Sequence, residues 1–129
     1  MAEAVFKQLN SRHEVLSAGT KVLSKEGESR HGQVLKELPA AENTILVLQE
    51  RLVDISGKKR TQLDPRLADW ADKIVVMAER ETVPEYLLKS PKAVFWKIAD
   101  PKGTALEAHR NILNHIDGLV RKFIEDNNL

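Results

Sequence analysis

Asp100 is the residue of this 129-residue chain whose position best suits acid–base chemistry. It follows the apolar run Ala93–Ile98 and precedes Pro101, so it stands where a strand is expected to end. In open α/β sheets, ligands bind beyond the carboxyl ends of the strands, and a carboxyl group there can transfer a proton. The alternative is an ordinary Asp-Pro turn. Asp64-Pro65 has the same dipeptide and is explained as a helix cap, whereas Thr104 is already the expected cap of the helix after Asp100.

A second candidate is the turn Ser17–Thr20 (SAGT), which follows the strand-like run His13–Ala18. Its backbone amides could bind an anion, although a plain strand-ending turn explains the same residues. The basic cluster Lys58–Arg60 lacks the neighbouring aromatic residues that single-stranded nucleic acids stack on. It is therefore interpreted as a solvated loop.

The chain contains no cysteine, which excludes a disulfide framework and a thiolate metal site. None of the histidines forms an H-x-H or H-x-x-x-H pair; they are His13, His31, His109 and His115. No Gly-rich dinucleotide fingerprint or Walker loop is present. We therefore expect neither a metal nor a cofactor.

Composition narrows the class of protein further. With 20 basic and 19 acidic residues the net charge is +1, which gives no electrostatic case for nucleic acid or an anionic membrane as partner. No apolar run approaches the ~20 residues of a membrane span, and no signal peptide is recognised, so the expected location is cytoplasmic. The length predicts a single domain over residues 1–129.

Helical spacing of apolar residues marks the first and last elements that must position these candidates. In MAEAVFKQLN, residues 1–10, they recur at Ala2, Val5, Phe6 and Leu9. The final helix is expected over residues 105–126, with Thr104 and Glu107 as a capping box. A third helix is predicted from an Asn43 cap to a stop at Gly57, although TILVLQ within it could instead be a buried strand.

Apolar runs with few charges mark the expected strands. They are His13–Ala18, Lys73–Ala78 and Ala93–Ile98, the second of them covered on both faces. Short helices are expected after Asp64 and after Val83-Pro84, and Trp70 and Trp96 are expected in the core. This alternation predicts an α/β fold, a three-layer α/β/α sandwich with a small parallel sheet.

Several segments resemble the low-molecular-weight protein tyrosine phosphatases and their arsenate-reductase relatives. They follow the family's order and spacing over nearly the whole chain: MAEAVF, HEVLSAGT, DISG, the Lys-Arg-x-x-Leu-Asp stretch of residues 59–64, ADKIVVM, W-x-I-x-DP-x-G and EAHRNI. In the family, a strand and a Cys-x5-Arg phosphate-binding loop immediately precede such a first helix. The resemblance therefore implies this fold without its first strand, which is a central one in the family's order 2-1-3-4.

The resemblance also implies roles for residues. Asp100 occupies the position of the general acid that protonates the leaving group, while the nucleophilic cysteine and the clamping arginine are not found. Lys21–Leu23 take the place of a loop that tunes substrate choice, and Lys102-Gly103 replace the tyrosine pair of many relatives. Substrate-binding residues stay unassigned.

The expected function is that of a phosphatase-like protein without phosphomonoesterase activity of its own, through truncation, a misassigned start or gene decay. The alternative is a non-catalytic pseudophosphatase that acts as an interaction or dimerisation module. A phosphorylated protein or small phosphoester would be the partner of an intact relative. For this chain, exposed strand edges predict self-association.

Overall fold

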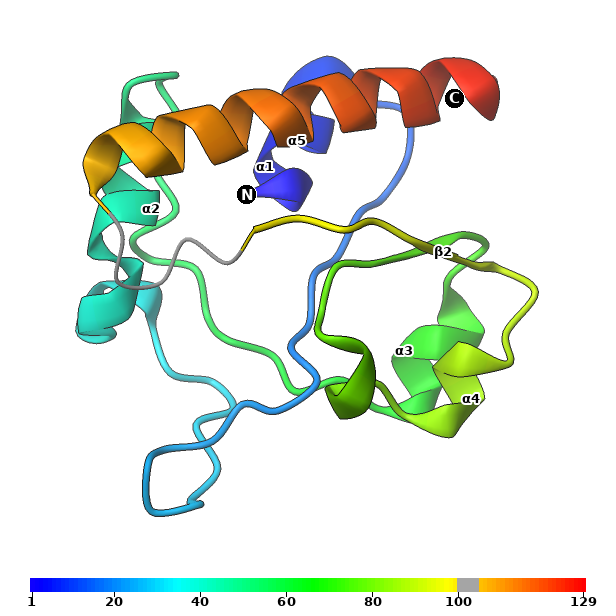
Figure 1. The fold of residues 1–129 in the computed structure, drawn as a ribbon, viewed down its shortest axis with the longest axis horizontal. Coiled ribbons are helices and arrows are strands. Elements are labelled where there is room, and N and C mark those ends of the chain that lie inside the picture. The colour runs from blue at the N-terminus through cyan, green and yellow to red at the C-terminus, as the bar shows by residue number, and fades with distance from the viewer. Residues whose placement is uncertain (100–104) are drawn as a thin grey trace. The chain divides into compact units, whose positions relative to one another are not determined.

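The computed structural model describes residues 1–99 and 105–129 (Figure 1). The chain divides into two compact units, which are described separately below. Unit 1 comprises Met1–Ser17, Val34–Lys58 and Ala99–Leu129, and unit 2 comprises Ala18–Gln33 and Lys59–Ile98. Within the described ranges, no helix combines the length and apolar character needed to cross a membrane.

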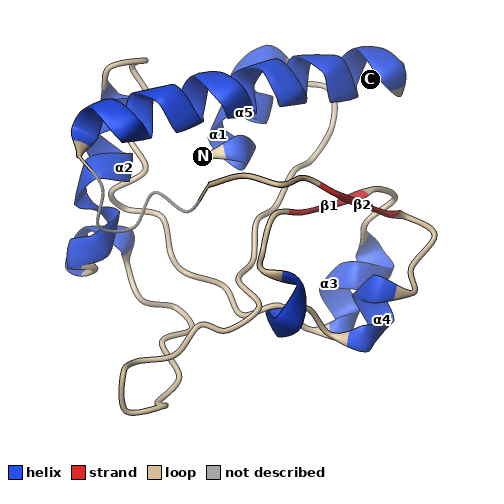
Figure 2. Ribbon diagram, in the orientation of Figure 1, coloured by secondary structure: helices blue, strands red, loops and turns tan. Residues whose placement is uncertain are grey.

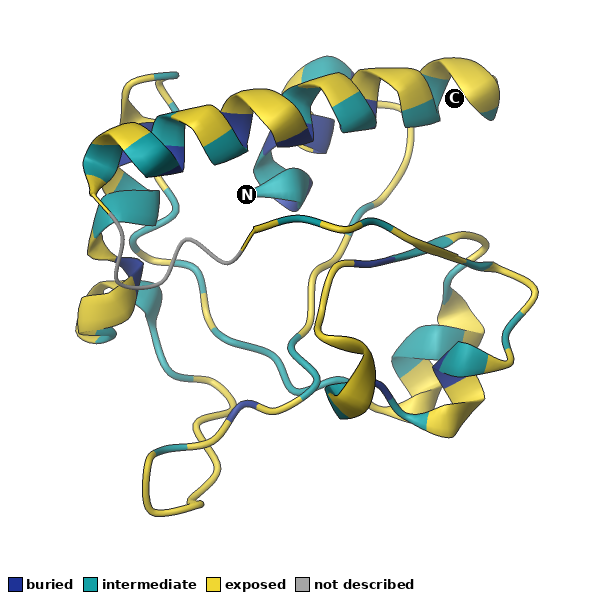
Figure 3. Cartoon of the chain, in the orientation of Figure 1, coloured by how far each residue is buried: buried dark blue, intermediate teal, exposed yellow. Residues whose placement is uncertain are grey.

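Unit 1 is built from helices. The long helix α5 (Leu106–Asp126) packs against α1 (Ala2–Leu9) and α2 (Glu42–Gln49), and two short 3-10 turns, Leu35–Glu37 and Pro39–Ala41, lead into α2. Each of the three helices contains buried residues (Figure 3). The buried apolar residues of these helices are Val5, Phe6, Val47, Leu48, Leu113, Ile116 and Val120. The helical prediction for residues 1–10 is confirmed.

The middle helix ends earlier than its apolar pattern predicted. It begins after Ala41 rather than an Asn43 cap, and it stops at Gln49 instead of continuing to Gly57. The chain then turns at Leu52, which has a φ of 64° and a side chain left 95% exposed. A leucine in this left-handed conformation is strained because its Cβ approaches the following carbonyl oxygen.

Ion pairs connect the C-terminal end of α2 with α5. Arg51 Nη1 lies 2.6 Å from Asp117 Oδ2, and Arg121 Nε lies 2.6 Å from Asp117 Oδ1. Hydrogen bonds from Arg121 and then from Arg51 hold the pKa of Asp117 below its usual value. About two turns earlier on α5, Arg110 pairs with Glu50 and Glu107.

Unit 2 contains the sheet. Strands β1 (Ile74–Val76) and β2 (Ala93–Phe95) are parallel, with Val75 opposite Val94 (Figure 2). The class predicted from the sequence, α/β with a small parallel sheet, is confirmed. The prediction of a central strand at Lys73–Ala78 is wrong in one respect, because β1 pairs with β2 alone among the described strands.

Short helices cover one face of the sheet in unit 2. They are α3 (Pro65–Trp70), the 3-10 turn Arg80–Thr82 and α4 (Glu85–Leu88). Val76, Val83 and Leu87 form the buried cluster between sheet and helices. Asp64 caps α3 as predicted, since its Oδ1 accepts a 3.0 Å hydrogen bond from Leu67 N.

Two predictions about unit 2 and its boundary are corrected. Trp70 is 49% exposed rather than in the core, because α3 ends at this residue, while Trp96 is half-buried. Residues His13–Ala18 form no strand, and Leu16 is 58% exposed. A strand requires a neighbour to pair its backbone groups, and the described residues supply none here.

Candidate functional site

Asp100, the predicted general acid, lies outside the described residues, as do Pro101, Lys102, Gly103 and Thr104. The structure defines the elements on either side of this segment. Strand β2 ends at Phe95, and α5 begins at Leu106. The predicted capping box is wrong, because Ala105 is the N-cap residue of α5 and Glu107 pairs with Arg110 at 2.9 Å.

The turn at Gly19-Thr20 is fixed by its own hydrogen bonds. Gly19 N donates to Thr61 O at 2.9 Å, and Thr20 Oγ1 donates to Thr82 Oγ1 at 3.0 Å. A Cβ on Gly19 would lie 2.8 Å from a methyl carbon of the buried Val22, so the packing requires glycine here. Since the Gly19 amide already has an acceptor, the plain-turn interpretation explains the turn better than an anion site does.

Gln62 organises this region, and the sequence analysis missed it. Its Nε2 donates to the carbonyls of Gly19, Thr20 and Leu63 at 3.0 to 3.2 Å, and its Oε1 accepts from Val22 N at 2.9 Å. A glutamine side chain offers an acceptor and two N–H donors, so one N–H is shared between two of the three carbonyl groups. No motif marks such a residue, because its partners come from a distant part of the chain.

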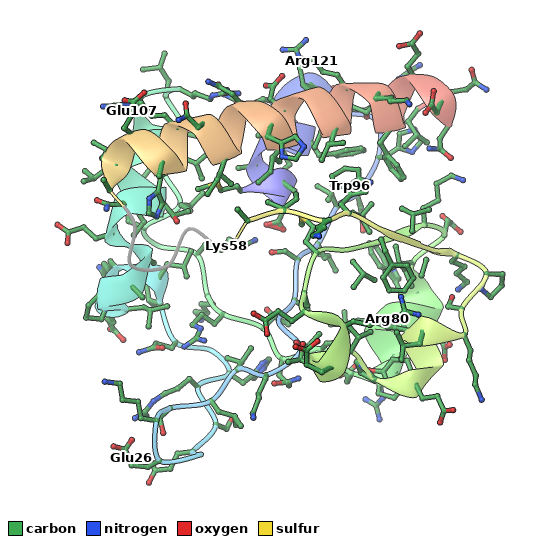
Figure 4. All side chains as sticks on the ribbon, viewed as in Figure 1. Glu26, Lys58, Arg80, Trp96, Glu107 and Arg121 are labelled. Carbon is green, nitrogen blue, oxygen red and sulfur yellow. The ribbon has the colours of Figure 1, made fainter. Side chains whose placement is uncertain are left out.

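A buried carboxylate lies at the N-terminal end of α1 in unit 1. The Glu3 side chain is only 7% exposed, and its Oε1 forms an ion pair with Lys58 Nζ. Lys58 is labelled in Figure 4. Its Oε2 has no hydrogen-bond partner among the described atoms. Lys58 was interpreted as part of a solvated basic loop; the structure shows instead that it compensates a buried charge.

Ser17 is the hydroxyl nearest to this carboxylate, but the pair is not an activated nucleophile. Ser17 Oγ donates to Glu3 Oε1 over 3.4 Å, which is longer than the roughly 2.6–3.2 Å of nucleophile–base pairs. The same oxygen is already engaged in the ion pair with Lys58.

Among the described residues, the histidines do not take part in a metal site. His109 is 2% exposed, and its Nδ1 lies 3.0 Å from Ala105 O, while His31 Nδ1 accepts from Gln62 N at 2.9 Å. In the part of the chain that the structure describes, no group of His, Asp and Glu side chains is arranged to hold a metal ion.

No protein-family model and no curated protein matches the sequence. Solved structures do match, over nearly the whole chain. Wzb from Vibrio vulnificus, in complex with benzylphosphonate, is 24% identical with a TM-score of 0.74, covering 97% of this chain and 87% of that chain. The low-molecular-weight protein tyrosine phosphatase from T. tengcongensis is 25% identical with a TM-score of 0.72, covering 97% and 88%.

The YwlE arginine phosphatase from Geobacillus stearothermophilus has the same fold, with 20% identity, a TM-score of 0.73 and coverage of 98% of this chain and 82% of that chain. These neighbours agree with the resemblance found in the sequence and extend it to the three-dimensional arrangement. The chain therefore has the fold of the low-molecular-weight protein tyrosine phosphatases.

Proposed function

We propose that this chain is a low-molecular-weight protein tyrosine phosphatase-like protein that does not hydrolyse phosphomonoesters by itself. One observation carries the proposal: the phosphatase fold is present over nearly the whole chain, yet none of its 129 residues is a cysteine. A cysteine-dependent phosphatase attacks phosphorus with a low-pKa thiolate, held in a nest of backbone amides beside a clamping arginine.

The remaining groups do not replace that nucleophile. Ser17 has no free base, since Glu3 is engaged by Lys58. An acid at Asp100 could protonate a leaving group only after something has attacked phosphorus. Without a nucleophile the acid has no reaction to complete.

The purified chain should be assayed with p-nitrophenyl phosphate, beside an Asp100→Asn variant and a buffer blank. We expect all three rates to be equal, with circular dichroism showing that both proteins are folded. Turnover well above buffer that disappears in Asp100→Asn would show a working acid and a nucleophile that we have not identified. Turnover that survives the substitution would contradict both the proposed inactivity and the role assigned to Asp100.

The second candidate function is a non-catalytic interaction or dimerisation module, favoured by β1 in unit 2, which among the described strands pairs along one edge only. A strand edge with free N–H and C=O groups is a template for pairing with another chain.

The cytoplasmic location also stays a prediction, which cell fractionation would test.

A further inference from the structure

We propose that His31 is a pH-sensitive latch within unit 2. While its ring is neutral, it holds the hairpin of residues 22–31 on the segment 59–63, and it releases the hairpin when the ring is protonated. All of these residues belong to unit 2. The latch is independent of the proposed lack of phosphatase activity.

The hairpin is closed on itself by its own backbone. Arg30 N donates to Val22 O at 2.9 Å, and Ser24 N donates to Glu28 O at 2.7 Å. Two further hydrogen bonds join the hairpin to the segment 59–63, and both end on Gln62. Gln62 N donates to His31 Nδ1 at 2.9 Å, and Val22 N donates to Gln62 Oε1 at 2.9 Å. The His31 ring is therefore one of the groups that attach the hairpin.

The direction of the bond to His31 fixes the state of the ring. A backbone N–H can only donate, so His31 Nδ1 must offer a lone pair and the ring must be neutral, with its proton on Nε2. A proton on Nδ1 would set two donors against each other at this distance. The closed hairpin therefore excludes a proton that the open hairpin can bind.

No ion pair compensates for a protonated ring. The charged residues of the hairpin and of the turn before it are Lys21, Lys25, Glu26, Glu28 and Arg30. Those of the facing segment and the cap after it are Lys59, Arg60 and Asp64. Most of them are cations, Asp64 accepts from Leu67 N, and none of the described carboxylates forms an ion pair with His31. Protonation therefore removes a hydrogen bond without adding an attraction.

Acid should open the hairpin and leave the rest of unit 2 folded. Histidine is the side chain that ordinarily changes charge between about pH 5 and 8, and His31 is the one histidine in the sequence of unit 2. Because the open form binds more protons, its population rises as the pH falls. The Gln62 side chain keeps its bonds to the carbonyls of Gly19, Thr20 and Leu63, which limits the opening to the hairpin.

The test is nuclear magnetic resonance of the whole isotopically labelled chain. At about pH 8 we expect the ring nitrogen shifts of His31 to show a proton on Nε2 and the Gln62 amide to be protected from hydrogen exchange. Between about pH 8 and about pH 5 the protection factor of this amide, corrected for intrinsic exchange, should fall about tenfold. The protection factors of Ile74 and Trp96, whose amides belong to the β1–β2 ladder, should stay constant.

Substitutions separate the acceptor from the charge. His31→Asn keeps an acceptor at the δ position that does not titrate, so the Gln62 amide should stay protected at both pH values. His31→Ala removes the acceptor and should leave this amide poorly protected at both. His115→Asn is the matched control in unit 1, and it should keep the pH dependence of the wild type. The Ile74 and Trp96 amides show that each variant is folded.

Several results would overturn the proposal. They are a Gln62 amide that is unprotected at about pH 8, a protection factor that does not change with pH, and a fall that persists in His31→Asn. A fall shared by the Ile74 and Trp96 amides would mean that unit 2 unfolds as a whole. A His31 ring with its proton on Nδ1 in the folded protein at about pH 8 would contradict the latch whatever the variants do.

Discussion

The helices of unit 1 and the strands of unit 2 satisfy their backbones in different ways, and the stabilising interactions differ accordingly. A helix pairs its own N–H and C=O groups, so α1, α2 and α5 need each other chiefly to bury apolar side chains. A strand needs a neighbour. In unit 2 the ladder is 3 residue pairs long, and the side chain of Gln62 supplies hydrogen bonds that a longer sheet would provide through its backbone.

The comparison teaches that unit 1 depends on packing and unit 2 on particular hydrogen bonds. The chain offers separate probes for the two units. Both of its tryptophans, Trp70 and Trp96, belong to unit 2, so their fluorescence reports on that unit. Most helical residues belong to unit 1, which dominates the far-ultraviolet circular dichroism.

The largest effect is expected from removing a core side chain in unit 1. Leu48 on α2 is 0% exposed, and Leu48→Ala should lower the free energy of unfolding by about 3 kcal/mol through lost burial and a cavity. Urea unfolding followed by circular dichroism measures it. Leu46→Ala is the matched control on the same helix, because Leu46 is 41% exposed. An equal loss in both variants would show that burial does not decide the stability of this unit.

The next effect concerns Gln62 in unit 2. Gln62→Glu places a carboxylate against three carbonyl oxygens and should cost about 2 kcal/mol, seen first in tryptophan fluorescence. Gln33→Glu is the control, since Gln33 Oε1 accepts a 2.8 Å hydrogen bond from Arg60 and a carboxylate suits that donor. If Gln62→Glu is as stable as the wild type, the hydrogen bonds of Gln62 do not hold unit 2 together.

Acid should weaken unit 1 through Asp117. Its folded-state pKa is held below the usual 3.8 by Arg121 and Arg51, so its stabilising effect is present above pH 3.8 and is lost as the pH falls through the folded-state pKa. Asp117→Asn should cost about 1 kcal/mol at neutral pH and flatten the acid limb of the stability curve.

The control for Asp117 is Glu85→Gln in unit 2. Glu85 is 74% exposed in its pair with Lys89, and its replacement should change stability very little because solvent screens the pair. If the free energy of unfolding of Asp117→Asn falls as steeply at low pH as that of the wild type, other carboxyl groups cause the pH dependence.

The smallest expected effect is a gain in stability at Leu52. Leu52→Gly should raise the free energy of unfolding by about 0.5–1 kcal/mol, because glycine adopts the φ of 64° without strain. Leu52→Ala keeps a Cβ and should give no such gain, which separates relief of strain from removal of an exposed side chain. Equal stability of the two variants would mean that the backbone at residue 52 is not strained.

Local patterns predicted much of unit 1 and little of the candidate site. The spacing of Val5 and Phe6 identified α1, and the long apolar face of residues 106–124 identified α5, since a helix depends on neighbours in sequence. The end of α2 was misplaced because Ile55 continues the apolar spacing after the chain has already turned at Leu52. No local pattern in the sequence predicted the Glu3–Lys58 ion pair, because its partners are 55 residues apart.

The sequence by itself determined the helices α1 and α5, the cap at Asp64, the absence of cysteine and the resemblance to a phosphatase family. Each of these depends on residue types or on short spacings along the chain. Only the tertiary structure decided that His13–Ala18 forms no strand, that β1 pairs with β2 alone among the described strands, and that Lys58 and Gln62 bind partners distant in sequence. The physical reason is that strands, buried charges and amide side chains are satisfied by groups distant in sequence, which only the folded chain brings within reach.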